Sequence, residues 1–314
     1  EESSPPPPPQ VSEAELRARH AALPDTPGTG PFPAMKEENP SLPEHVIYRP
    51  ASLAALGEAK LGLYLFGNGA CTNDGASSRL HLLEVASHGY LAIAPGRIRT
   101  GPGATAPLLP PPPLTLHPNP GGAPASMPAR PTRYADLTSA LDWALTQNRD
   151  PKSPYYGKVD PAAVAVSGYS CGGFQALLIA ADPRVKTVVI MNSGIYNPGT
   201  GPVIDGMEGL SKTLLDTLHT PTLYILGGKS DIAYPNGIDD FARISRVPVF
   251  MGNLLNVGHA GTYWDPNGGK AAAAVVAWLD WQLKRDSRAA KRFVGADCGL
   301  CTDPAWAVEK KRID

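Results

Sequence analysis

The stretch of sequence that decides the fold runs Val164-Ala165-Val166-Ser167-Gly168-Tyr169-Ser170-Cys171-Gly172-Gly173-Phe174-Gln175-Ala176. A β-branched apolar run enters it and an Ala/Leu-rich run leaves it, which predicts a strand that turns sharply into a helix. Gly168 to Gly172 fit G-x-S-x-G, a pattern that carries meaning only in this strand-to-helix context. There, Ser170 would stand in a strained conformation at the end of a sheet, with the helix N-terminus behind it. The alternative interpretation is a glycine-rich turn in an ordinary βα unit.

Short apolar runs on both sides of this stretch predict further strands. Runs that are apolar throughout are typical of strands buried on both faces of a parallel sheet. Helical patterns alternate with them, and this alternation predicts an α/β protein with a mostly parallel, doubly wound sheet and helices on both faces. No second domain boundary is visible, so we expect no large separate lid domain. The expected strands are 45–50, 61–66, 90–94, 164–167, 185–191, 222–226 and 249–255, and the expected helices are 77–88, 134–148, 172–181, 210–218, 238–244 and 270–284.

Composition and charge set the broad class of the protein. Hydrophobic residues make up 42% of the 314 residues and charged residues 18%, which is enough for a sizeable core. The formal net charge of −1 gives no reason to expect a nucleic acid or an anionic membrane as a partner. No apolar run approaches the roughly 18 residues that a membrane span needs. We expect a monomer.

The chain divides into an α/β unit, expected over residues 45–286, and two flanking segments. Residues 1–44 are expected to be a proline-rich spacer and extension, in which residues 11–20 have helical composition and residues 23–43 are expected to be loop. Ser12 and Glu15 are placed as in a helix capping box. Five consecutive prolines within Glu1 to Gln10 predict an extended, solvated segment. Such a spacer is common after a cleaved export signal, and it fits a linker from a larger protein equally well.

Residues 95–131 form a long insertion that is dense in proline and glycine. A loop of this length in a compact domain is usually functional or disordered. Because it follows a strand whose end faces the ligand-binding edge of the sheet, it could form a wall of a substrate cleft. A solvated surface insertion is the equal alternative.

Three residues with the chemistry of nucleophilic catalysis follow the ends of predicted strands. Ligands bind at the carboxyl ends of the strands in open α/β sheets, and Ser170, Asp231 and His259 all fall there. The chain order Ser, Asp, His is that of the α/β-hydrolases. A serine hydroxyl is a weak nucleophile, so His259 would take its proton and return it to the leaving group. Asp231 would orient the imidazole and stabilise its charged form.

The acid and the base each have competitors. Asp231 could instead cap the helix that follows it, in which case Asp205 is the reserve acid. Only His259 follows the last predicted strand, within Gly-His-Ala-Gly. The other six histidines precede the core, lie on or at the end of a helix, fall in the insertion or precede a strand.

A tetrahedral oxyanion needs two backbone N–H donors. One would be Cys171, the residue after the nucleophile. The other would come from the loop that follows residues 61–66, with Ala70 as the first choice and Cys71 as the alternative. Four aromatic residues flank the triad positions and would either line an apolar or aromatic acyl pocket or pack the loops: Tyr169, Tyr234, Tyr263 and Trp264.

On these residues the chain resembles the α/β-hydrolase superfamily, over about residues 45–285. Within it, Ala86-Ser87-His88-Gly89-Tyr90-Leu91-Ala92-Ile93-Ala94 resembles the helix-to-strand segment of dienelactone hydrolase-like esterases. Cutinase-like polyester hydrolases, chlorophyllases and platelet-activating-factor acetylhydrolases share this segment. Gly67-Asn68-Gly69 stands where that group has its early oxyanion loop. The sequence departs from the polyester hydrolases in three places: the loop lacks their aromatic residue after the glycine, Cys171 replaces their methionine, and the 95–131 insertion is long.

The four cysteines are an even number, which fits two disulfides in an oxidising compartment. Cys298-Gly299-Leu300-Cys301 favours a local clasp. No second C-x-x-C pair or nearby histidine accompanies it, which argues against zinc. It follows the last core helix rather than opening a thioredoxin-like unit, which argues against a redox role. Cys71 and Cys171 both adjoin expected oxyanion donors, which must converge on one oxygen. We therefore expect a Cys71–Cys171 disulfide, with a buried pair of thiols as the alternative.

The predicted elements give a catalytic domain over residues 45–286, followed by a tail over residues 287–314. The resemblance implies a serine carboxylic-ester hydrolase that acts on small or aromatic esters or on polyesters, with no cofactor and no metal. The spacer and the cysteines favour a secreted, periplasmic or cell-surface location. One alternative is a serine peptidase or acyltransferase of the same fold. A peptidase of the prolyl-oligopeptidase type carries a propeller domain for which this chain has no room. The other alternative is a non-catalytic binding protein, which predicts a broken triad.

Overall fold

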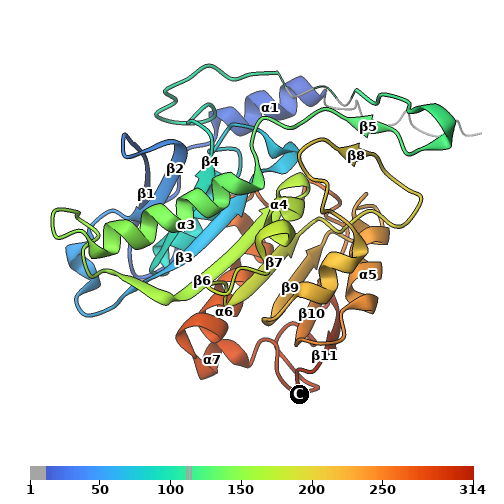
Figure 1. The fold of residues 1–314 in the computed structure, drawn as a ribbon. Helices are drawn as coiled ribbons and strands as arrows, with labels where there is room; N and C mark the ends of the chain where they lie inside the picture. Colours follow the sequence, from blue (N-terminus) through green and yellow to red (C-terminus); the bar gives the residue numbers. More distant parts are fainter. Residues whose placement is uncertain (1–11, 111–112, 114) are drawn as a thin grey trace, which may run out of the picture.

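The computed structural model describes residues 12–110, 113 and 115–314, so the expected spacer Glu1–Gln10 lies outside the described residues. At its centre is a nine-stranded sheet with helices on both faces (Figure 1). The order across the sheet is β1 (Ala34–Asn39), β2 (Leu42–Pro50), β4 (Tyr90–Pro95), β3 (Leu61–Gly67), β6 (Val159–Tyr169), β7 (Thr187–Met191), β9 (Thr222–Leu226), β10 (Val249–Leu254) and β11 (Trp306–Lys311). The six inner strands, from β4 to β10 in this order, are parallel, whereas β1, β2 and β11 are antiparallel to their neighbours.

The inner strands divide their side chains between two cores. In β3, Leu63 and Leu65 enter the core under one layer of helices, while Tyr64 and Phe66 enter the core on the opposite face. Because strand side chains alternate, an unbroken apolar run is what such a strand requires. The expected mostly parallel, doubly wound α/β fold is confirmed.

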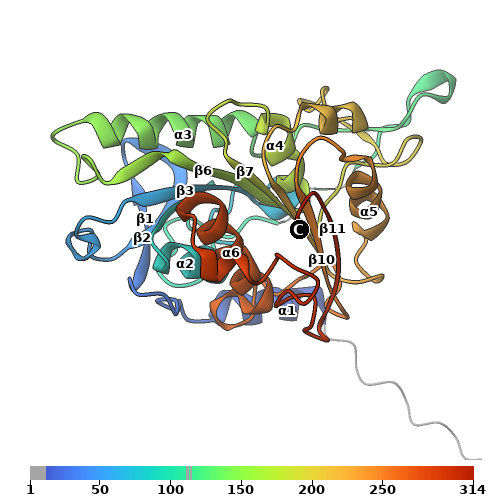
Figure 2. The same cartoon turned by 90° about the horizontal axis from the view of Figure 1, so that it is seen from below.

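Two layers of helices cover the sheet, and Figure 2 shows them on opposite sides of it. The first layer is α3 (Tyr134–Arg149), α4 (Cys171–Ile179) and α5 (Tyr234–Arg243). The second layer contains α2 (Arg79–Ser87) and α6 (Gly269–Lys284), with the short α7 (Ser287–Ala290) after it. Shorter elements lie in the connections: η1 (Ala54–Leu56), η2 (Gly69–Cys71), η3 (Pro120–Gly122), η4 (Lys212–Thr217) and η5 (Pro266–Gly268). The segment 210–218, predicted as a short helix, therefore contains a 3₁₀ helix.

The strand order places a crevice at the carboxyl ends of β3 and β6. From β3 the chain continues to β4 on one side, and β6 pairs with β3 on the other side. This reversal of strand order is the topological switch point, outside which ligands bind in open α/β sheets. The loop Asn68–Cys71 after β3 and Ser170 after β6 both lie at this point.

Two edge strands correct the expected boundaries. Residues 23–43 were expected to be loop, but they contain β1, and the tail expected over 287–314 contributes β11. The sheet thus extends beyond the range 45–286. Both strands are rich in Lys and Glu, since an edge strand faces solvent on one side, and they therefore lack the apolar signal of the inner strands.

The helix expected over residues 11–20 is α1 (Glu13–Ala22), and Ser12 and Glu15 form the predicted capping box. The buried guanidinium of Arg79 on α2 fixes the C-terminal end of α1. It donates to the carbonyl oxygens of His20 at 2.7 Å and of Leu23 at 2.8 Å. It also pairs with Asp25 Oδ1 at 3.1 Å.

The insertion 95–131 has more order than its composition suggests. Its strand β5 (Ser126–Met127) pairs in parallel with β8 (Val203–Ile204) from the connection after β7. Part of its proline run, residues 111 and 112, lies outside the described residues.

Candidate active site

Ser170 occupies the sharp turn between β6 and α4. Its backbone has φ 53° and ψ −119°, a strained conformation for a residue with a side chain. The turn brings backbone very close: a Cβ at Gly168 would clash with Gly172 and one at Gly172 would clash with Gly67. The two glycines of G-x-S-x-G are thus required by sterics, and they leave the serine at the sheet edge.

Ser170, His259 and Asp231 form a continuous chain of hydrogen bonds. Ser170 Oγ lies 2.9 Å from His259 Nε2, and His259 Nδ1 lies 2.7 Å from Asp231 Oδ1. These distances fit a serine hydroxyl that gives its proton to an imidazole, which is oriented in turn by a carboxylate. The structure therefore brings together the three residues that the sequence singled out.

Asp231 is only 1% exposed, yet it is held as a carboxylate. Burial by itself would raise its pKa, but hydrogen bonds from His259, from the N–H of Ala233 and from the amide of Asn192 outweigh burial and lower the pKa below its usual value. The N–H of Gly227 donates to Oδ2 as well, at 2.9 Å. This environment keeps the acid ionised so that it can stabilise an imidazolium.

Two tyrosines, Tyr169 and Tyr263, support the position of His259 and Asp231 through hydrogen bonds. Tyr169 donates its hydroxyl to the backbone oxygen of His259 at 2.8 Å, and its ring lies 4.3 Å from that of Tyr263. Tyr263 donates to Asn192 Oδ1 at 3.1 Å, and Asn192 donates to Asp231 at 2.9 Å. Burial raises the pKa of both phenols, so both remain donors over the working pH range.

The loop after β3 contains the two residues expected to supply the second oxyanion donor, Ala70 and Cys71. The N–H of Cys71 already donates to the oxygen of Asn68 at 3.0 Å, and the Cys71 side chain is fully buried. Ala70, by contrast, lines the cleft beside Ser170 and Cys171. Of the two expected donors in this loop, the geometry favours Ala70.

Ala70 and Cys71 in the loop after β3 both have a strained backbone. Ala70 has φ 53° and Cys71 has φ 49°, and left-handed backbone costs an L-residue roughly 1–2 kcal/mol. The predicted Cys71–Cys171 disulfide is present, with the Cα atoms 5.3 Å apart, and it ties this loop to the first residue of α4. The predicted Cys298–Cys301 disulfide is present too. Two disulfides are compatible with an extracellular protein.

A cleft of about 780 Å³ surrounds Ser170 and His259. One wall comes from the 95–131 insertion, through Leu108, Leu109, Met127 and Arg130. The insertion is therefore a wall of the cleft rather than a solvated surface loop. A second wall comes from α1, through Leu16, Arg17 and His20. Phe174, Tyr196, Ile204 and Ile232 complete the apolar lining.

Three of the four aromatic residues expected near the substrate line this cleft: Tyr169, Tyr263 and Trp264. Tyr234 does not, because it is the first residue of α5 and packs against the core under that helix. The reserve acid Asp205 is exposed at the end of β8, where its N–H bonds the oxygen of Met127. The acid that hydrogen-bonds His259 Nδ1 is Asp231, at 2.7 Å.

Sequence reasoning missed the α1 wall and Arg130. His20 stacks on Trp264 with ring centroids 4.6 Å apart, which joins α1 to the cleft rim. No local motif marks these residues, because their positions depend on the packing of segments far apart in the chain.

In the part of the chain that the structure describes, no cluster of three or more His, Cys, Asp or Glu side chains could hold a metal ion. No helix among the same residues has the length and apolar character needed to cross a membrane. The chain matches no protein-family model, and a search of curated proteins finds no significant match.

Proposed function

We propose that this protein is a serine carboxylic-ester hydrolase of the α/β-hydrolase superfamily, acting through an acyl-enzyme. The observation that carries the proposal is the hydrogen-bonded chain Ser170–His259–Asp231 at 2.9 and 2.7 Å, with the serine on a strained turn at the mouth of a cleft. A binding protein of the same fold would have no need for this chain of donors and acceptors. The two disulfides support a secreted, periplasmic or cell-surface location.

The proposed reaction has two halves. Ser170 Oγ attacks the ester carbonyl carbon while His259 Nε2 takes its proton, and the new oxyanion accepts hydrogen bonds from the N–H groups of Ala70 and Cys171. As the tetrahedral intermediate collapses, His259 returns the proton to the leaving alcohol. A water molecule then attacks the acyl-enzyme, again through His259, and releases the carboxylic acid and the free serine.

The cleft lining supports an ester with a large apolar part. Leu16, Leu108, Ile232 and Trp264 line it and remain 38% to 75% exposed. Exposed apolar residues gathered at one site mark a binding surface. Small esters would leave this rim uncovered, whereas a long acyl chain, an aromatic ester or a polyester chain would cover it.

The test is a panel of p-nitrophenyl esters from acetate upward, with feruloyl and polyester substrates, on wild type, Ser170→Ala and the exposed control Ser211→Ala. Wild type and the control should hydrolyse esters, and Ser170→Ala should lower kcat by at least about 10⁴-fold. Undiminished hydrolysis by Ser170→Ala would reject the mechanism. Failure of wild type on every ester would favour a binding role.

A further inference from the structure

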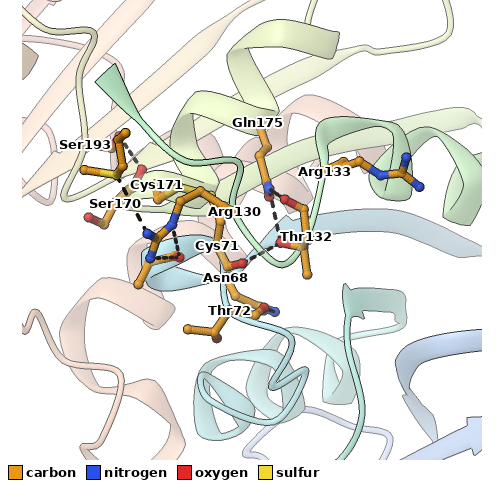
Figure 3. Close-up of a disulfide and its surroundings, with 12 residues drawn as sticks. Asn68, Cys71, Thr72, Arg130, Thr132, Arg133, Ser170, Cys171, Gln175 and Ser193 are labelled. Atoms are coloured by element: carbon orange, nitrogen blue, oxygen red, sulfur yellow. Dashed lines mark hydrogen bonds between the residues drawn. A yellow bond between two sulfur atoms is a disulfide. The ribbon is translucent and has the colours of Figure 1, made fainter. Parts of the chain in front are cut away.

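Arg130, near the end of the insertion, is a buried cation beside the oxyanion loop. It is 8% exposed and lines the cleft. Its Nε and Nη2 both donate to the carbonyl oxygen of Ala70, at 3.2 and 3.1 Å. Figure 3 shows its guanidinium directed toward this loop, near the disulfide.

The charge of Arg130 has no carboxylate partner among the described residues. None of their ion pairs includes Arg130. Its remaining bonds go to the oxygen of Pro113 at 3.4 Å and the sulfur of Met127 at 3.7 Å. Buried arginines are usually paired with an acid. Burial also lowers the pKa of this guanidinium.

The next carbonyl of the loop is held by the same segment. Thr132 donates both its N–H, at 3.1 Å, and its hydroxyl, at 2.9 Å, to the oxygen of Cys71. Gln175 on α4 donates to the oxygen and the hydroxyl of Thr132, at 3.0 and 3.1 Å. The carbonyls of both left-handed residues are therefore held by Arg130 and Thr132. Strained backbone persists only where its surroundings fix it in this way.

We propose that Arg130 is a positioning residue of the oxyanion site. By holding the carbonyl oxygen of Ala70 it fixes the backbone of that residue so that the Ala70 N–H faces the developing oxyanion, and it places a positive charge beside the loop. This inference rests on the proposed ester hydrolysis. The ester carbonyl is neutral before attack and negative in the tetrahedral transition state. A cation without a counter-ion therefore stabilises the transition state more than the bound substrate, and its loss should lower kcat rather than raise KM.

The decisive variants are Arg130→Ala and Arg130→Lys, with the exposed neighbour Arg133→Ala as the matched control. On an uncharged ester such as p-nitrophenyl butyrate, Arg130→Ala should lower kcat by about 10–100-fold and change KM by less than about threefold. Arg130→Lys keeps the charge but loses the two-pronged donation to one oxygen, so its kcat should fall by an intermediate factor. Arg133→Ala should behave like wild type.

Two further readouts separate positioning from a general loss of structure. Added guanidinium, at a concentration that does not unfold the protein, should restore part of the rate of Arg130→Ala and leave Arg133→Ala unchanged. A trifluoromethyl ketone, which forms an oxyanion on Ser170 without a leaving group, should bind Arg130→Ala and Arg130→Lys more weakly by the factor lost in kcat/KM. The Lys variant carries the test if the Ala variant does not fold.

If folded Arg130→Lys and Arg130→Ala both kept the wild-type kcat, the inference about Arg130 would be overturned. Loss of hydrolysis in Ser170→Ala would still support the proposed ester hydrolysis in that case. A rise in KM confined to esters that bear a carboxylate, at unchanged kcat, would also overturn it and would make Arg130 a substrate anchor. Absence of hydrolysis by wild type would instead reject the proposed function itself.

Discussion

At the scale of single residues, strain is concentrated at the cleft. Nine non-glycine residues of the described chain have positive φ, and four of them are Ala70, Cys71, Ser170 and Asn192. Each is held by specific contacts. Arg130 bonds Ala70, and the disulfide and Thr132 hold Cys71. Ser193 bonds Ser170, and Tyr263 bonds Asn192. Strain fixed in this way is typical of pre-organised functional sites.

The carboxylate of Asp231 should matter for orientation rather than for proton transfer. Asp231→Asn keeps the size of the side chain but presents an amide to His259 Nδ1, which favours the wrong tautomer. We expect kcat on p-nitrophenyl esters to fall by about 10⁴-fold with a folded protein.

The matched control is Asp205→Asn, the reserve acid of the sequence analysis. Because Asp205 is exposed just after β8, the kcat of Asp205→Asn should stay within about twofold of wild type. A large loss in Asp205→Asn with none in Asp231→Asn would contradict the assignment of the acid.

At the scale of elements, α1 is part of the cleft rather than of a spacer. Its C-terminal end is fixed by fully buried Arg79, and burial together with the charge of Arg79 lowers the pKa of His20 to about 3. The imidazole that stacks on Trp264 is thus neutral at physiological pH, and this wall should not change its charge in esterase assays.

Leu16→Ser tests whether α1 contacts the substrate. Leu16 lines the cleft and is 40% exposed, so its loss should weaken binding of long acyl chains without unfolding the protein. We expect KM for an octanoate ester to rise about fivefold to tenfold, roughly 1–1.4 kcal/mol, while the acetate ester is unaffected. Ala18→Ser, on the exposed side of α1, is the control. Equal effects on acetate and octanoate would contradict a wall formed by α1.

The inner strands could be predicted from sequence and the edge strands could not, for one physical reason. Burial on both faces makes β3, β7 and β9 continuously apolar, whereas β1 and β11 carry Lys and Glu because one side faces water. The convergence of Ser170, His259 and Asp231 could be predicted because each of them follows an inner strand. Arg130 and α1 could not be predicted, since their positions depend on long-range contacts.

At the scale of the whole molecule, the two disulfides should contribute unequally to stability. Cys71–Cys171 closes a separation of 100 residues and Cys298–Cys301 one of 3. Chain entropy predicts about 4.7 kcal/mol for the first and about 1.6 kcal/mol for the second. Urea unfolding of the two paired Cys→Ser variants should show Cys71→Ser/Cys171→Ser to be the less stable, by about 3 kcal/mol. A larger loss in the C-terminal pair would contradict the expectation.

Buried His81 should make the fold sensitive to acid. It is 1% exposed and bonds Tyr64, and burial lowers its pKa to about 3. The unfolded chain, with a histidine pKa near 6.5, binds more protons between these values, so the free energy of unfolding falls as pH falls below 6.5. At pH 5 the loss from this one group should be about 2 kcal/mol relative to pH 8.

The measurement is urea unfolding at pH 5 and pH 8 for wild type, His81→Gln and the exposed control His117→Gln. His81→Gln should show a smaller difference between the two pH values than wild type, and His117→Gln should show the wild-type difference. An unchanged difference in His81→Gln would contradict a buried neutral imidazole.

Ser170 is proposed to be a nucleophile activated by His259 and Asp231. Mass spectrometry of the protein after treatment with a fluorophosphonate, which labels activated serines covalently, tests this proposal. We expect a single adduct on the peptide that contains Ser170, absent in Ser170→Ala and formed much more slowly in Asp231→Asn. No adduct, or an adduct on another serine that persists in Ser170→Ala, would contradict it.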